Sequence, residues 1–223
     1  EGQPEARGKL GALTDRLLPL VDVYRVLLKA RQRRGALDFD APEPRFVFNA
    51  AEQITGIDLP LRNDAHKLIE ECMVLANVAT ARELAARSRP TLYRVHAEPD
   101  ERKLETLVTT LRALNVGVEF PAEIHTRDLQ KIAQRIKDPA ARPFIETLVV
   151  RAMMQAAYQP VNIGHFGLAL KHYAHFTSPI RRYPDLVVHR TIKAMLSGQD
   201  PAGRSYESTE LEMIGVRLTE CEK

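Results

Sequence analysis

The stretch 175–190 has the sequence HFTSPIRRYPDLVVHR and holds the side chains best suited to phosphate chemistry. A Ser-Pro pair at 178 is typical of a helix start, and the proline at 184 offers a second, later start. From either start Arg181 and Arg182 lie at a helix N-terminus, where free N–H groups and the helix dipole already attract anions. Two guanidinium groups oppose that dipole unless a phosphate or carboxylate binds. The spacing predicts an anion site, with an ion pair between Arg182 and Asp185 as the alternative.

The residues around this motif are basic. Within 160–196 five basic residues face one acid, Asp185, although the whole chain carries a net charge of only +3. The five are Lys171, Arg181, Arg182, Arg190 and Lys193. Four of the seven histidines lie in the same stretch, namely His165, His172, His175 and His189. Such a concentration of basic side chains favours an anionic partner.

A carboxylate on a second segment is the other candidate for chemistry. The sequence RNDAHKLIEECMVLAN, residues 62–77, places Asn63, Glu70 and Asn77 on one stripe of a helix that is apolar nearly all round. We expect Glu70 to be the buried functional carboxylate and Glu71 to be solvated. A plain surface role for Glu70 is the alternative.

The sequence predicts no metal site and no membrane span. Asp38 and Asp40 share one face of a predicted strand, but no third ligand follows them, and Cys72 and Cys221 cannot form a four-ligand zinc site. No apolar run approaches the roughly 18 residues that a membrane span needs, and the N-terminus has no apolar signal region. We expect a cytoplasmic protein. Because the chain does not begin with Met, we also expect it to be a piece of a longer one.

The elements that position these residues can be read from apolar spacing. The 223 residues, 44% of them hydrophobic, suffice for a core. Spacings of three and four predict helices over 8–33, 62–87, 100–115, 126–137, 139–156 and 178–196, and a capping box at 209–212 predicts a last helix. Alternation predicts strands over 36–40, 45–49, 54–59, 91–95 and 166–173, the first two forming a hairpin. We expect a single α+β domain over residues 1–223, helix-rich with a small sheet.

Several long motifs together resemble the catalytic domain of the ribonuclease II/ribonuclease R family. They are LLKARQRRGALDFD, FVFNA, RNDAHKLIEECMVLAN, LYRVH and HFGLALKHYAHFTSPIRRYPDLVVHR, in that order. The resemblance runs over almost the whole chain. The form PIRRYPD is more similar to the ribonuclease R branch than to the ribonuclease II branch.

The resemblance implies a function and roles for single residues. Members of the family are processive 3′→5′ hydrolytic exoribonucleases that use a divalent metal, here expected to be Mg²⁺. They draw the 3′ end of single-stranded RNA through a basic channel and release nucleoside 5′-monophosphates. Arg181 matches the arginine on the scissile phosphate, and Glu70 matches a glutamate near the terminal nucleotide. The expected RNA-binding residues are Arg181, Arg182, Arg190, Tyr173, His165 and Asn77, of which Tyr173, His165 and Asn77 receive no specific role.

The resemblance also predicts what the chain lacks. The metal-holding aspartates and the base-stacking tyrosine of the family lie N-terminal to the residues present here. The chain is therefore expected to be the C-terminal two-thirds or so of the catalytic domain, with no metal ligands of its own. An arginine can stabilise phosphate charge but cannot generate the nucleophile, so we expect the isolated chain to be inactive. The alternatives are an RNA-binding module of the same fold that does not cleave, and a structural helical domain whose arginines form ion pairs.

Overall fold

The computed structural model describes residues 8–37, 44–59, 62–121, 123–136, 141–197 and 206–222. The chain forms two compact units, one made of residues 1–33 and 38–72 and the other of residues 34–37 and 73–223. That residues 1–223 form a single domain stays a prediction.

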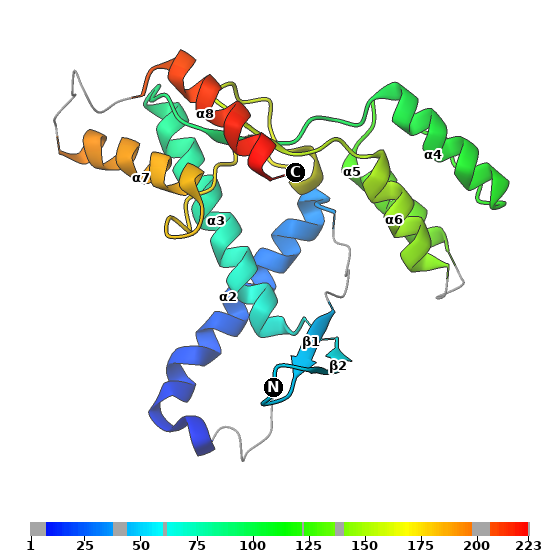
Figure 1. Ribbon diagram of the computed structural model, residues 1–223, viewed down its shortest axis with the longest axis horizontal. Coiled ribbons are helices and arrows are strands. Elements are labelled where there is room, and N and C mark those ends of the chain that lie inside the picture. The colour runs from blue at the N-terminus through cyan, green and yellow to red at the C-terminus, as the bar shows by residue number, and fades with distance from the viewer. Residues whose placement is uncertain are drawn as a thin grey trace. The chain divides into compact units, whose positions relative to one another are not determined.

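The first unit contains one long helix and a hairpin (Figure 1). After a short 3₁₀ helix, η1 (Gly11–Leu13), the helix α2 runs over Thr14–Arg34. The strands β1 (Arg45–Phe48) and β2 (Ile54–Asp58) are antiparallel, with Phe46 opposite Ile57. The described partner of 45–48 is thus the strand after it, and the hairpin predicted between 36–40 and 45–49 stays a prediction. Residues 38–40 lie outside the described residues.

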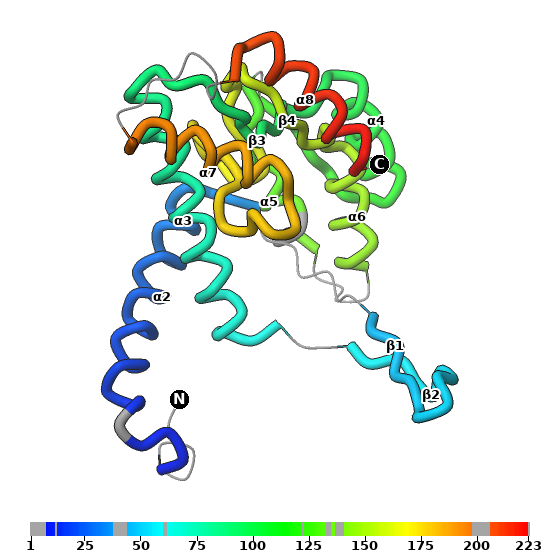
Figure 2. Tube along the Cα trace, turned by 60° about the vertical axis from the view of Figure 1, so that its left-hand side comes forward, coloured from blue at the N-terminus to red at the C-terminus, as the bar shows by residue number. Residues whose placement is uncertain are grey.

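The second unit is built on a two-stranded sheet and the helices around it (Figure 2). The strand β3 (Tyr93–Val95) pairs antiparallel with β4 (Ala157–Gln159), where the sequence predicts no strand. The helices are α3 (Asp64–Ala86, shared with the first unit), α4 (Glu101–Ala113), α5 (Thr126–Arg135), α6 (Arg142–Ala152), α7 (Tyr183–Leu196) and α8 (Ser208–Cys221). A helix-rich α+β fold with small sheets is thereby confirmed.

Apolar side chains from α3, β3 and α7 form the core beneath the candidate site. Leu84 and Val188 are fully buried there together with Ala174. A second cluster joins Leu92 and Leu211 with Val187 of α7. One face of α7 is thus fixed by packing, which holds the start of this helix in place.

The helix ends show where local signals suffice. The Asp100 side chain accepts a hydrogen bond from the Lys103 amide at 2.8 Å and caps α4, as the helix predicted over 100–115 requires. Asn63 caps α3 in the same way through the amides of residues 65 and 66. The capping box predicted for the last helix is wrong, because α8 starts at Ser208 and its N-cap, Glu207, makes no side-chain cap bond.

The segment 162–172 is a compact turn rather than the predicted strand over 166–173. It contains the 3₁₀ helix η2 (Phe166–Leu168), closed by bonds between the backbones of His165 and Leu170. Gly167 lies against the ring of His96, where an added Cβ would stand 2.8 Å from Nδ1. The absence of a side chain at 167 lets the turn approach β3 this closely.

Candidate functional site

The Ser-Pro-Ile-Arg-Arg motif forms a turn before α7 instead of the first turn of the helix. The helix starts at Tyr183 with Pro184 in its first turn, so the later of the two predicted starts is the one used. Arg182 is the N-cap residue and has extended backbone angles of φ −125° and ψ 116°. The amides of Arg181 and Arg182 donate to the Ser178 carbonyl at 3.3 and 3.0 Å. Both arginines therefore stand at the N-terminal end of α7, as predicted.

Asp185 anchors this turn from inside the protein. Its carboxylate has no exposed surface and accepts three hydrogen bonds. Two come from Arg182, from Nε at 2.9 Å and from Nη2 at 2.8 Å, and one comes from the Ser178 amide at 2.8 Å. A bidentate guanidinium–carboxylate pair is geometrically specific, so it fixes the turn as well as neutralising the buried charge.

The side chains at the tip of the turn point away from this anchor. Arg181 is exposed, and among the described residues it has no recorded ion pair or hydrogen bond to its guanidinium. Ile180 beside it is fully exposed. The backbone of the turn is thus held firmly while the Arg181 guanidinium stays available to an anion. Arg182 forms the ion pair with Asp185 that was the predicted alternative to an anion site.

The segment before the turn is pinned by buried polar groups. The Phe176 amide donates to Asn77 Oδ1 at 2.9 Å, and the Phe176 carbonyl lies 2.9 Å from His189 Nε2. The rings of Phe176 and His189 stack with their centroids 4.3 Å apart. The segment 176–182 is therefore held at its start by Asn77 of α3 and His189 of α7, and at its end by Asp185 of α7.

Two of the predicted RNA-binding residues are buried. Asn77 is 2% exposed and Tyr173 is 7% exposed, and Asn77 Nδ2 donates to the Tyr173 hydroxyl at 3.1 Å. Their side chains shape the site from within. That they contact RNA stays a prediction, because nothing in the structure tests it.

The first unit reverses the expectation for the two adjacent glutamates. Glu71 is the buried one, with its side chain 6% exposed and its Oε1 2.6 Å from Nη1 of Arg31. Glu70 is 40% exposed and is held by the same Arg31 nitrogen at 3.1 Å and by Arg62. The buried guanidinium of Arg31 on α2 decides this, because it requires a carboxylate beside it. Glu70 is thus a positioned, half-exposed carboxylate.

Two of the four histidines near the motif add no positive charge at neutral pH. Burial, helped by His96 and Arg94, lowers the pKa of His165 to about 3. Burial, followed by the charge of Arg182, lowers the pKa of His175 to about 4. Both of these rings are neutral near pH 7, so they do not contribute to an anion site as cations.

Arg190 lies on the exposed face of α7 against two tyrosines. Its Nη1 donates to the hydroxyl of Tyr206 at 2.9 Å and to that of Tyr183 at 3.5 Å. Its guanidinium also stands 5.9 Å from the centre of the Tyr183 ring. It presents a charge beside an exposed aromatic ring, a combination suited to a nucleotide.

The residues that the structure describes form no metal site. Among them no group of three or more His, Cys, Asp or Glu side chains could hold a metal ion. The described side chains therefore do not fit a bound Mg²⁺. Asp38 and Asp40 lie outside the described residues. No helix among those described is long and apolar enough to cross a membrane.

The turn, its buried anchor and the flanking motifs match a known family. A family model described as the RNB domain matches residues 1–198. The chain belongs to the RNB domain family. Ribonuclease R of Vibrio parahaemolyticus is 44% identical over 232 residues, and ribonuclease R of Escherichia coli K12 is 39% identical over 233 residues. Both alignments cover all of this chain and 28% of the relative.

The fold of this RNB chain agrees with solved structures. It matches Mycoplasma genitalium RNase R in complex with ribose methylated single-stranded RNA, with a TM-score of 0.85 and 29% identity. That match covers 92% of this chain and 33% of the other. The resemblance drawn from the motifs is confirmed. The RNB chain spans well under a third of the length of its ribonuclease R relatives.

Two residues that shape the site receive no role of their own from the sequence. His189 is only one of the four histidines of the basic stretch and Arg31 is an ordinary helix position, and each becomes important through its partner in the fold. A charged or polar residue on an otherwise apolar helix face is the available signal. Such a signal marks a position without naming its partner.

Proposed function

We propose that the chain is part of a cytoplasmic, processive exoribonuclease that hydrolyses single-stranded RNA from its 3′ end to nucleoside 5′-monophosphates. Membership of the RNB family and the names of the ribonuclease R relatives support this proposal. The observation that carries it is Arg181, an exposed guanidinium on a turn held by the buried carboxylate of Asp185.

In this proposal Arg181 binds the scissile phosphate. Negative charge on the non-bridging oxygens rises as the phosphodiester bond breaks, and a guanidinium already held in place meets that change without reorganisation. The anchored turn supplies the placement, and Arg182 acts mainly by holding the turn. Arg190 and the ring of Tyr183 give a further contact to the RNA strand. His165, Asn77 and Tyr173 shape the wall that the strand passes.

Glu70 is assigned to the terminal nucleotide. Its carboxylate is oriented by Arg31 and Arg62 and remains 40% exposed, so it can accept a hydrogen bond from a sugar hydroxyl. The buried Glu71 serves to neutralise Arg31.

Hydrolysis also requires an activated water, which the family resemblance assigns to divalent metal. The described side chains do not provide a group of ligands for such a metal. The residues of this chain bind and orient the phosphate. We propose that the isolated chain does not cleave RNA.

Single-turnover cleavage by the full-length protein tests the role of Arg181. Arg181→Ala should lower the cleavage rate by about 10²–10³-fold, the usual cost of removing one such donor. RNA affinity should fall much less, because a long strand makes many other contacts. Arg181→Lys should restore only part of the rate, since a point charge cannot reproduce the planar fork.

The control is Arg151→Ala, which removes an exposed arginine from the end of α6. This variant should change neither the cleavage rate nor the RNA affinity. Equal losses of rate and affinity for Arg181→Ala would make Arg181 a binding residue only. RNA binding without any cleavage by the unmodified full-length protein would favour the non-catalytic RNA-binding module.

A further inference from the structure

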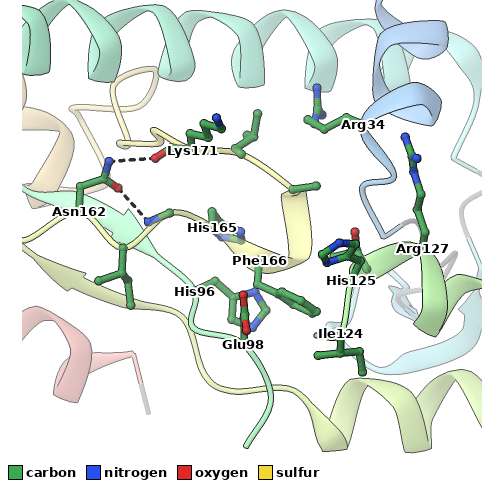
Figure 3. Close-up of a pocket in the computed structure, with 15 residues that line it drawn as sticks. Arg34, His96, Glu98, Ile124, His125, Arg127, Asn162, His165, Phe166 and Lys171 are labelled. Atoms are coloured by element: carbon green, nitrogen blue, oxygen red, sulfur yellow. Dashed lines mark hydrogen bonds between the residues drawn. The ribbon is translucent and has the colours of Figure 1, made fainter. Parts of the chain in front are cut away.

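A cavity of about 650 Å³ lies within the second unit, beside η2. Its wall is made by the start of α5, the segment after β3 and the turn 162–171 (Figure 3). Arg181, Arg182 and Glu70 are not among its lining residues. Its volume lies in the range of sites that take a small organic ligand rather than a single ion.

The walls of this cavity are tied together before any ligand arrives. Arg34 Nε donates to the Leu168 carbonyl at 2.8 Å, and the Leu37 amide donates to the Gly167 carbonyl at 2.9 Å. The Arg127 side chain packs across Gly35, where an added Cβ would stand 2.5 Å from the Arg127 Cγ. A preformed site spends little binding free energy on ordering its own walls.

Basic side chains gather on one side of the cavity. Figure 3 shows Lys171, Arg34 and Arg127 along its upper side and Glu98 on the opposite side. Lys171 and Arg127 are exposed and have no recorded ion pair within the described part of the chain. Three cations against one carboxylate favour an anionic group on the upper side.

Rings occupy the middle of the cavity between these two sides. The labelled rings of His165 and Phe166 lie there in Figure 3. His165 Nδ1 accepts from the Leu168 amide at 3.2 Å, so in the neutral ring the hydrogen is on Nε2. No partner for Nε2 is recorded among the described residues. The middle of the cavity thus offers a flat apolar surface and one N–H donor.

We propose that this cavity binds one nucleotide unit, with its phosphate on the basic side that carries Lys171, Arg34 and Arg127 and its base against Phe166 and His165. A bare phosphate would leave the rings uncovered, whereas a base covers them by stacking. The Glu98 carboxylate on the opposite side suits an exocyclic amino group of the base. The nucleotide is either part of an RNA strand or a free nucleoside 5′-monophosphate. The RNA source rests on the proposed function, but the free nucleotide does not.

Titration of the ¹⁵N-labelled chain tests this proposal. The probes are adenosine 5′-monophosphate, a five-residue oligoadenylate and inorganic phosphate. We expect amide shifts over 162–171 with the first two, and clearly weaker binding of inorganic phosphate. The double variant Lys171→Gln/Arg127→Gln should weaken nucleotide binding by at least about tenfold, since it removes two of the three cations on the basic side.

The matched control is Arg102→Gln/Arg151→Gln, which removes the same charge from exposed helix positions outside the cavity. It should leave the affinity unchanged. Binding of both nucleotide probes supports a site for either source, and binding of the oligoadenylate alone supports the RNA strand. Absence of shifts with both, an equal loss in the control, or equal affinity for inorganic phosphate would overturn the proposal.

One further variant separates this proposal from the proposed function. Arg181→Gln should leave the shifts of adenosine 5′-monophosphate at 162–171 unchanged. Loss of those shifts would place the nucleotide at Arg181 and overturn the cavity site. Failure of the full-length protein to cleave RNA would overturn the proposed function and leave the mononucleotide result standing.

Discussion

The two neighbouring arginines of the turn should behave in opposite ways when each is replaced by alanine. Arg182→Ala removes two hydrogen bonds from a carboxylate with no exposed surface and leaves Asp185 only the Ser178 amide. Breaking a buried ion pair from one side costs about 3–5 kcal/mol. Arg182 is itself 20% exposed, and water entering its place recovers part of this. We therefore expect a loss of about 2–4 kcal/mol in the free energy of unfolding.

Arg181→Ala is the matched comparison, because it removes the same side chain one residue earlier. Its guanidinium is exposed and makes no recorded bond within the described residues, so its loss should change the free energy of unfolding by no more than about 0.5 kcal/mol. The variant with the intact fold is then the one that should lose catalysis in the full-length protein.

Urea unfolding of the chain, followed by circular dichroism, measures the free energy of unfolding of both alanine variants. The slope m should be the same for all variants, so that the midpoints report stability alone. Arg182→Lys should fall between Arg182→Ala and the unmodified chain, because one ammonium cannot make both bonds. If Arg182→Ala cost less than about 1 kcal/mol, or Arg181→Ala cost as much, the anchor we describe would not hold the turn.

Three other outcomes are expected. The folded-state pKa values of His165 and His175 lie near 3 and 4, below the ordinary value of 6.5, so the unfolded chain takes up protons first as the pH falls. Stability should be highest above pH 6.5 and drop by on the order of 2 kcal/mol per histidine between pH 7 and 5, and urea unfolding of His165→Gln should show a shallower dependence. RNA binding by the chain should weaken with salt, with a slope of log affinity against log salt of about −0.7 for each phosphate contact; a flat plot would argue against an arginine-based site. The isolated chain should leave labelled RNA intact with Mg²⁺ or Mn²⁺, and release of mononucleotides would contradict this.

Local signals in the sequence determined much of the helical framework. The start of α4 was predictable because Asp100 and the amide that it caps are only three residues apart in the sequence. The place of the two arginines before α7 was predictable because the missing N–H of Pro184 is harmless only in a first helical turn. The motifs themselves were specific enough to indicate the family.

Tertiary contacts decided the features that depend on distant partners. Glu70 and Glu71 are adjacent on α3, and only the position of Arg31, about forty residues earlier, determines which one is buried. The strand β4 has too few residues to show a period, and it exists because β3 lies beside it. The predicted strand over 166–173 folds into a turn because Gly167 must fit against His96.

The charge state of the ionisable side chains also depends on distant partners. Sequence assigns each histidine its ordinary pKa, but burial beside other rings and arginines keeps His165 and His175 neutral. Sequence offers the pairing of Arg182 with Asp185 only as an alternative to an anion site, whereas in the structure the buried Asp185 binds Arg182 and leaves Arg181 to a ligand. Residue type and local spacing thus determine which groups are available. Only the packing of distant segments determines which of them are neutralised inside the protein and which remain free to act.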